Sequence, residues 1–400
     1  MKQNRSVAKD SCQRTVFLIV SWTIPPNASG SAVTIKNLVQ NFASDQAVIL
    51  GQVPYKGRIS LKGMQRHHRI TIPSYTLSWR LKHFLDPLYC MPLVLFFGVR
   101  AVRRYKIRYV IGVFPNAAFF ISAYLIARLE RKPFFPYYHN LYVETRKNNF
   151  HAYLAVKIQQ HIFRHSASLF SMSHGMSEFL MKSYRVNTIP LLHALNLPIP
   201  RFRTLQIHNA PYRIGMSGNI NQTMLSPLKA VVGALRRTND FELLLHTPMQ
   251  REQVLSIIRI PDTKISVVDI CDPAELVSSL SQCDVLVLGL SERKDGRREG
   301  DYQTQFPTRT LEVLLAGKPI LLLCPEKYYL AQFFRQNECG FVLSSLNPDQ
   351  VLRSLYRLCE DKSSSEFYVA NALITARKFK GERVAKVLLD ELHAHNHEMR

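Results

Sequence analysis

Residues Phe306-Pro-Thr-Arg-Thr-Leu-Glu-Val-Leu-Leu-Ala-Gly-Lys-Pro319 predict a helix that is followed at once by a strand at 320–324. Pro307 and Thr308 favour the first helical turn, and leucines recur on one face. Gly317 predicts the end of the helix. This unit is typical of a chain in which strands and helices alternate.

The beginning of this helix is a candidate site for a diphosphate, because a helix N-terminus presents unpaired N–H groups and partial positive charge. Arg309 adds a bidentate donor there. Glu312, one turn later, is placed to accept hydrogen bonds from the two hydroxyls of a ribose. The alternative is a surface helix whose early glutamate only complements the helix dipole.

The net charge lies almost entirely in the first half of the chain. The 400 residues are 46% hydrophobic and 20% charged, which predicts a globular protein of two or at most three domains. Residues 1–200 carry 26 Lys and Arg against 6 Asp and Glu, whereas residues 201–400 carry 26 against 23. We therefore expect the first half to meet an anionic partner, such as membrane headgroups, nucleic acid or a phosphorylated acceptor.

Cysteine spacing and apolar segments indicate where the protein resides. The seven cysteines contain no C-x-x-C pair and lie mostly in apolar segments, so we expect reduced core residues in a cytoplasmic protein. The apolar run 16–22 is too short for a signal peptide or a membrane span and predicts the first strand. A second apolar run, 88–99, predicts a helix that is either buried or lies in a membrane interface among basic residues.

The periodicity predicts an α/β protein with two Rossmann-like, doubly wound domains that face each other across a cleft. Regular patterns fade between 190 and 211, which marks the domain boundary. We expect one domain at 1–205, a second at 206–379, and a terminal helix at 380–400 that crosses back to the first. The predicted strands are 16–21, 47–50, 109–113, 134–138, 168–171, 213–217, 241–246, 264–269, 284–289, 320–324 and 340–343.

Three further elements fall where parallel strands end, which is where ligands bind in such sheets. Gly30 follows the first strand and permits close approach of the backbone to a ligand. His139 follows the strand at 134–138 and is suited to bind a sugar hydroxyl or to move a proton. The turn after 213–217 carries Ser217, Gly218 and Asn219, which suit phosphate or sugar. The alternatives are that Gly30 only permits a tight turn and that His139 is a surface or hydrogen-bonded residue without a function.

The charged loop 291–305 precedes the key helix and is long for such a connection, which favours a functional role. Asp301, Gln303 and Gln305 are placed there to reach a sugar. The sequence has no Asp-x-Asp and no zinc-type ligand spacing, so we expect neither a metal nor another cofactor.

Taken in order, these elements resemble the GT-B glycosyltransferases, in particular the retaining, family-4-like enzymes of glycosyltransferase group 1. The resemblance covers nearly the whole chain and is strongest at 213–345. It implies a second domain that binds a nucleotide sugar and a first domain that presents the acceptor. It gives His139 a catalytic role, and we expect Arg309 to be the second catalytic residue. It assigns donor binding to Gly30, Ser217, Gly218, Asn219, Thr308, Thr310, Leu311 and Glu312, with the amides of 308–311 as the diphosphate cradle.

The chain departs from this family at two points. The family has a pair of glutamates eight positions apart, and the first would fall at Thr304. Its contact to the donor sugar is missing here or is supplied by Asp301, Gln303 or Gln305. The family also places an Arg and a Lys after the first strand of the second domain, where this chain has Ser217 and Asn219. Arg309 is the candidate replacement, since Lys229 lies in the next helix.

The predicted function is therefore transfer of a hexosyl group from a nucleotide sugar, with retention and without a metal, in polysaccharide or lipid-linked glycan biosynthesis. The basic first domain favours a glycan or lipid-linked acceptor at the inner face of the cytoplasmic membrane, where the enzyme would be peripheral. No specific nucleic acid is expected. The alternatives are a decayed GT-B scaffold that binds polyanions and a GT-B-type sugar-nucleotide epimerase.

Overall fold

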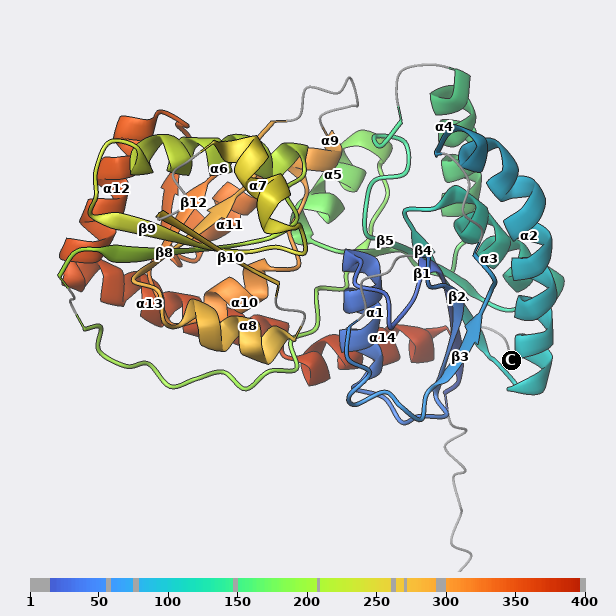
Figure 1. Ribbon diagram of the computed structural model, residues 1–400. Helices are drawn as coiled ribbons and strands as arrows, with labels where there is room; N and C mark the ends of the chain where they lie inside the picture. Colours follow the sequence, from blue (N-terminus) through green and yellow to red (C-terminus); the bar gives the residue numbers. More distant parts are fainter. Residues whose placement is uncertain are drawn as a thin grey trace, which may run out of the picture.

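Two lobes lie side by side, each built around a parallel sheet with helices on both faces (Figure 1). The structure is a computed structural model, and it describes residues 15–54, 59–74, 79–146, 150–206, 209–259, 264–269, 272–292 and 300–395. The sheet of the first lobe lies within 17–190 and that of the second within 212–343.

The first lobe has seven parallel strands in the order β3-β2-β1-β4-β5-β6-β7. The strand order reverses beside β1, so the loops that follow β1 and β4 open into a crevice. The strands are β1 (Phe17–Thr23), β2 (Ala47–Gln52), β3 (His68–Thr71), β4 (Tyr109–Phe114), β5 (Phe134–Tyr138), β6 (Phe170–Ser171) and β7 (Ile189–Pro190). The helices are α1 (Gly30–Val39), α2 (Trp79–Arg104), α3 (Ala117–Leu129), α4 (Phe150–Arg164) and α5 (His174–Tyr184).

Both faces of this sheet are buried, because successive side chains of a strand point to opposite sides. Leu18 and Val20 of β1 belong to the core under α2, α3 and α4. Phe17 and Ile19 belong to the core under α1 and the last helix, α14 (Gly381–Ala394). Burial on both sides explains why the central strands of this lobe, such as β2, β4 and β5, are rich in apolar residues.

The second lobe repeats the plan with six parallel strands in the order β10-β9-β8-β11-β12-β13. The strands are β8 (Tyr212–Ser217), β9 (Phe241–His246), β10 (Ile265–Val268), β11 (Val285–Gly289), β12 (Ile320–Leu323) and β13 (Phe341–Leu343). The helices are α6 (Gln222–Leu235), α7 (Arg251–Ile258), α8 (Pro273–Leu280), α9 (Gly300–Gln303), α10 (Thr310–Leu315), α11 (Tyr329–Gln336), α12 (Pro348–Glu360), α13 (Lys362–Ala376) and the short η2 (Arg377–Phe379).

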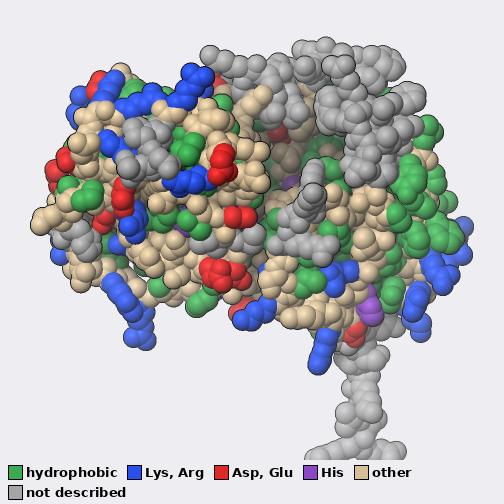
Figure 2. All heavy atoms as spheres, viewed as in Figure 1, with side chains coloured by type: hydrophobic (Ala, Val, Ile, Leu, Met, Phe, Trp, Pro, Cys, Tyr) green, Lys and Arg blue, Asp and Glu red, His purple; other side chains and the backbone are tan. Residues whose placement is uncertain are grey.

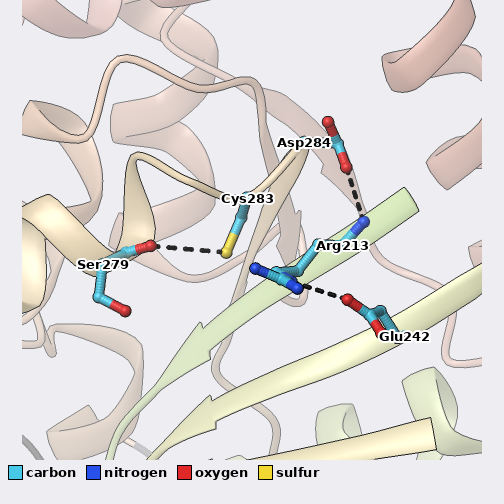
Figure 3. Close-up of polar contacts among 5 residues, drawn as sticks. All are labelled: Arg213, Glu242, Ser279, Cys283 and Asp284. Atoms are coloured by element: carbon cyan, nitrogen blue, oxygen red, sulfur yellow. Dashed lines mark hydrogen bonds and ion pairs between the residues drawn. The ribbon is translucent and has the colours of Figure 1, made fainter. Parts of the chain in front are cut away.

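Polar contacts surround the amino end of β8, which is the end opposite Ser217 (Figure 3). The Arg213 backbone N–H donates to the Asp284 carboxylate at 2.7 Å, and the Arg213 guanidinium donates to Glu242 at 2.7 Å. Cys283 packs beside them, and burial raises the pKa of its thiol to about 12. The register set here carries through to Ser217 at the other end of β8.

The chain returns to the first lobe at its end. Val384, Ala385, Leu388 and Leu392 of α14 are buried in the core that contains β1 and α1. The crossing point is tight, because a Cβ on Gly381 would lie 2.0 Å from Oδ1 of Asn196. Helix α14 therefore belongs to the packing of the first lobe, although it follows the second in sequence.

The sequence did not predict β3 or β7, and it predicted too long a helix at 306–319. Strand β3 is a short edge strand with no buried side chain, so it lacks an apolar alternation. Strand β7 has two residues and ends in a proline. The helix α10 has only six residues and begins at Thr310. The preceding prolyl segment instead forms a turn against the cleft.

The apolar run at 88–99 is part of α2, a helix of 26 residues. Cys90 and Val94 are buried in the core, and a Cβ on Gly98 would lie 2.2 Å from Cδ1 of Ile126. Leu88 and Phe96 are nevertheless 69% and 63% exposed. One face of α2 is thus core and the other is open. Within the described residues, the helices include none of the length and apolar character that crossing a bilayer requires.

Candidate functional site in the cleft between the lobes

A cavity of about 290 Å³ lies where the strand ends of the two sheets face each other. Figure 2 shows the surface hollowed between the two lobes at this place. The first lobe contributes the start of α1 and the residues after β5 and β6. The second contributes the residues after β8 and β11 and the segment before α10. Most of the predicted site residues line this cavity: Gly30, His139, Ser217, Gly218, Asn219, Gln305, Thr308 and Arg309.

His139 lies in the cleft immediately after β5. Its Nδ1 is 3.0 Å from the hydroxyl of Ser31, and its Nε2 is buried without a hydrogen-bond partner among the described residues. Tyr137 packs edge-on against the ring at 4.4 Å. Burial, with a smaller contribution from nearby His193, lowers the pKa of His139 to about 3. The imidazole is therefore neutral at physiological pH, with Nε2 available to a ligand.

Gly30 brings the two lobes close together. It is the first residue of α1, whose N-cap Ser29 accepts from the amide of Ala32. A Cβ on Gly30 would lie 3.8 Å from Cγ2 of Thr308 in the second lobe. The start of α1 therefore faces the turn before α10 directly across the cleft.

The turn after β8 requires a glycine. Gly218 has a φ of +149°, and a Cβ there would lie 2.7 Å from Sδ of Met224. The Ser217 hydroxyl beside it is buried without a hydrogen-bond partner among the described residues. Asn219 is exposed at the rim, while Lys229 is exposed on α6 outside the lining of the cleft. The only groups that this turn offers a ligand are therefore neutral.

The segment 306–315 corrects the predicted diphosphate cradle. The amides of Thr310 and Leu311 already donate to the carbonyls of Pro307 and Thr308, at 3.0 and 3.4 Å. Thr310 is fully buried beneath the turn and does not line the cavity. Of the predicted cradle residues 308–311, Thr308 lines the first cavity beside Arg309, whereas Thr310 and Leu311 do not.

Arg309 is the cation of this site. Its charge opposes the rise in the pKa of Glu312 that burial causes, and it adds to the lowering of the pKa of His246 by burial. Its Cδ would lie 3.9 Å from a Cβ on Gly218, which places its side chain beside the turn after β8. Arg309 therefore lies between that turn and α10. That it replaces the charge of the missing Arg and Lys remains a prediction.

Glu312 lines a second cavity, of about 310 Å³, together with Leu311 and Thr308. Its side chain is 9% exposed, and Oε2 has no hydrogen-bond partner among the described residues. Burial raises the pKa of this carboxyl group, whereas its backbone hydrogen bond and Arg309 act in the opposite direction. A buried carboxylate oxygen without a donor is a strong acceptor for a ligand hydroxyl.

The sugar contacts predicted from the loop before α10 are placed differently. Asp301 is 3% exposed and accepts from the backbone amide of Leu141 at 2.9 Å, which joins the second lobe to the His139 loop. Gln303 lies in α9 and does not line the cavity, whereas Gln305 does. Thr304 faces inward and bonds to the backbone of α9. Residues 293–299 of this loop lie outside the described residues.

Four lining or neighbouring residues were missed by the sequence analysis. Ser31 orients His139, and Asn140 contacts Asp301 at 3.4 Å. His193 bridges the lobes between the Thr34 hydroxyl and the Phe306 carbonyl. Ser31 and Asn140 adjoin predicted site residues, so proximity to them was an available signal. His193 and His246 had none, because the chain has 14 histidines.

The cleft presents hydroxyl, imidazole, amide and guanidinium groups rather than a cluster of metal ligands. Among the described residues, no group of three or more His, Cys, Asp or Glu side chains is arranged to hold a metal ion. The five described cysteines are free thiols.

The comparisons with known proteins identify the fold. No family model matches the sequence, and no curated protein matches it. HepE from Anabaena, in complex with UDP-glucose, is similar with a TM-score of 0.67 at 12% identity, over 94% of this chain and 99% of HepE. A glycosyltransferase from Rickettsia africae gives 0.63 at 13% identity, over 94% and 98%. A putative UDP-N-acetylglucosamine 2-epimerase from Listeria monocytogenes gives 0.59 at 12% identity, over 96% and 97%.

These similarities extend over both lobes and their connection. The chain has the GT-B fold, as the sequence predicted, with two Rossmann-like domains around a cleft. At 12 to 13% identity, these similarities establish the fold alone, and the function has to be inferred from the residues of the cleft.

The buried His139 predicts a loss of stability in acid. Its folded pKa of about 3 lies below the ordinary 6.5, so the unfolded chain takes up a proton that the folded site refuses. The free energy of unfolding should therefore decrease as the pH falls from about 6.5 towards 3, by about 1.4 kcal/mol per pH unit for this histidine. Urea unfolding at pH 7.5, 6.5 and 5.5 measures this slope.

The variant His139→Asn should have the shallower slope, whereas His165→Asn, at an exposed position on the same lobe, should keep the wild-type one. Equal slopes for all three proteins would show that His139 titrates normally in the folded state.

Proposed function

We propose that this protein is a glycosyltransferase that moves a hexosyl group from a nucleotide sugar to a glycan or lipid-linked acceptor. The observation that carries the proposal is a pair of buried ligand-facing atoms without hydrogen-bond partners among the described residues, Oε2 of Glu312 and Nε2 of His139. They line two cavities that meet at Thr34 and Thr308. Buried polar atoms are normally satisfied, so such a pair favours a polar ligand.

One orientation of the donor follows from this proposal. The ribose hydroxyls would donate to Glu312, the diphosphate would lie at Thr308 and Arg309, and the sugar would reach His139. Ser217 and Gly218 would border the diphosphate, and Asn140 and Gln305 would lie nearest the sugar. The bound sugar nucleotide in HepE supports this class of donor.

The leaving group is a nucleoside diphosphate, whose growing negative charge has to be stabilised as the glycosidic bond breaks. Arg309 supplies a charge there, and the turn at Thr308 supplies backbone donors. Neutral His139 can donate from Nε2 to a sugar hydroxyl. We propose transfer with retention, guided by positioning on one face of the sugar and independent of a metal. No Asp or Glu, the usual covalent nucleophile in retaining glycosyl chemistry, lies among the described residues that line the first cavity.

The acceptor is proposed to lie at an anionic membrane surface, to which the protein binds peripherally from the cytoplasm. Leu88 and Phe96 are exposed on α2, and Phe96 lines a surface groove together with Arg100 and Arg104. Figure 2 shows hydrophobic side chains gathered over the edge of the first lobe where α2 lies, with Lys and Arg side chains below them. An apolar face bordered by cations suits a bilayer interface.

Two other functions are compatible with this architecture. An epimerase is favoured by the similarity to the Listeria protein, and it would convert a free sugar nucleotide without an acceptor. A non-catalytic scaffold is favoured by the neutral turn after β8 and by Thr304, which faces inward where the family has a glutamate. Product analysis without acceptor separates the first, and nucleotide binding separates the second.

The donor proposal predicts that a nucleoside diphosphate raises the melting temperature in a screen of UDP, GDP, dTDP and CMP. A ligand at 100 times its Kd should add about 2.7 kcal/mol of stability. Glu312→Ala should remove most of the shift, because hydrogen bonds to a carboxylate contribute about 1.5–3 kcal/mol each. Glu252→Ala, at an exposed glutamate in the first turn of α7, is the matched control and should keep the shift.

A protein whose melting temperature responds to none of these nucleotides, but which binds RNA in a salt-sensitive manner, would instead be a polyanion-binding scaffold.

The membrane proposal predicts sedimentation with vesicles that contain anionic lipid at low salt, and little sedimentation with neutral vesicles. Each cation at the surface contributes about 1 kcal/mol, so Arg100→Gln with Arg104→Gln should weaken binding by more than about tenfold. Lys229→Gln on the second lobe is the control. Equal binding of the wild-type protein to neutral and anionic vesicles would refute this surface.

A further inference from the structure

The second cavity is walled by both lobes. Helix α1 and the segment 193–197 line it from the first lobe, and α8 and α10 line it from the second. It adjoins the first cavity, since Thr34 and Thr308 line both. Its volume of about 310 Å³ falls at the lower end of the range of small-molecule sites.

Lys36 of α1 enters this cavity from the first lobe. Its side chain is only 7% exposed, although lysine is seldom buried without a partner. Among the described residues, its ammonium group makes neither a hydrogen bond nor an ion pair. Burial lowers the pKa of Lys36, whereas the charge of Asp272 raises it. An ammonium on a cavity wall that has no hydrogen-bond partner among the described residues favours a ligand with acceptor atoms.

The carboxylates near Lys36 make their contacts with other groups. Asp272 caps α8, and its Oδ1 accepts from the amides of Ala274 and Glu275 at 2.8 and 3.3 Å. Glu312 belongs to the other lobe, and the charge that shifts its pKa is that of Arg309. The cavity thus offers a donor on one side and an acceptor, Oε2 of Glu312, on the other.

We propose that this cavity holds the nucleoside of the donor and that Lys36 donates a hydrogen bond to a carbonyl oxygen of its base. This inference rests on the proposed function and names the base that the site selects. An ammonium has three donors and no acceptor. Uracil and guanine present carbonyl oxygens, whereas adenine presents an amino group, so the site selects a keto-bearing base.

The same contact makes the nucleoside a bridge between the lobes. The ribose binds Glu312 of the second lobe while the base binds Lys36 of the first. The diphosphate lies beyond Thr308 in the other cavity and makes no contact with Lys36. Loss of the Lys36 charge should therefore weaken the binding of nucleotides and leave the binding of inorganic pyrophosphate unchanged.

Isothermal titration of the full chain with UDP, GDP, ADP and inorganic pyrophosphate tests this inference. Wild-type protein should bind UDP or GDP at least tenfold more tightly than ADP. Lys36→Met should weaken UDP or GDP by at least tenfold, remove the preference over ADP, and bind pyrophosphate as before. Lys386→Met, at an exposed position on α14, is the control. The thermal melting of each variant, measured without ligand, shows that it is folded.

The outcomes separate the two proposals. Binding of UDP and ADP with equal affinity by the wild-type protein would overturn the inference without any variant. Unchanged UDP binding by Lys36→Met, or an equal loss of UDP and pyrophosphate binding, would also overturn it while the proposed function stands. If the wild-type protein binds no nucleotide, both proposals fall.

Discussion

The arrangement of the site depends on two parallel sheets whose carboxyl ends face each other. Parallel sheets bury both faces under helices, so the loops at their strand ends are the parts left to bind ligands. Buried contacts hold the two edges together: Asp301 accepts from Leu141, and His193 joins Thr34 to Phe306. Helix α14 follows the second lobe in sequence but packs in the core of the first. His139 and Arg309 are thereby brought to one cavity from opposite lobes.

The charge distribution within the cleft shapes the proposed chemistry. Its second-lobe turn carries Ser217 and Asn219, so the stabilisation of a leaving diphosphate rests on Arg309 and the adjoining turn. Burial keeps His139 neutral, which makes it a hydrogen-bond donor or acceptor rather than a cation. Glu312 is buried beside Arg309, whose charge favours the ionised carboxylate against the effect of burial. In the proposed binding of a sugar nucleotide, each of these groups has a different role.

Most of the fold was predictable from the sequence, because strands buried on both faces appear as short apolar runs between turn residues. Edge strand β3 escaped prediction since none of its side chains is buried. The Gly30, His139 and Ser217 loops were found from their position after strands. The exact start of α10 could not be predicted, because Pro307 is equally compatible with a turn. The amides of Thr310 and Leu311 donate to the carbonyls of that turn. Lys36 could not be identified from the sequence, since a lysine in a helix is usually exposed and the cavity that it lines is formed by both lobes.

The central claim is that a nucleotide sugar lies across the cleft with its diphosphate beside Arg309. A crystal structure of the protein with bound UDP tests this most directly. The diphosphate should lie at the turn of Thr308 and Arg309, and the ribose hydroxyls should lie within hydrogen-bond distance of the Glu312 carboxylate. UDP bound outside the cleft, or in it with the ribose turned away from Glu312, would contradict the account.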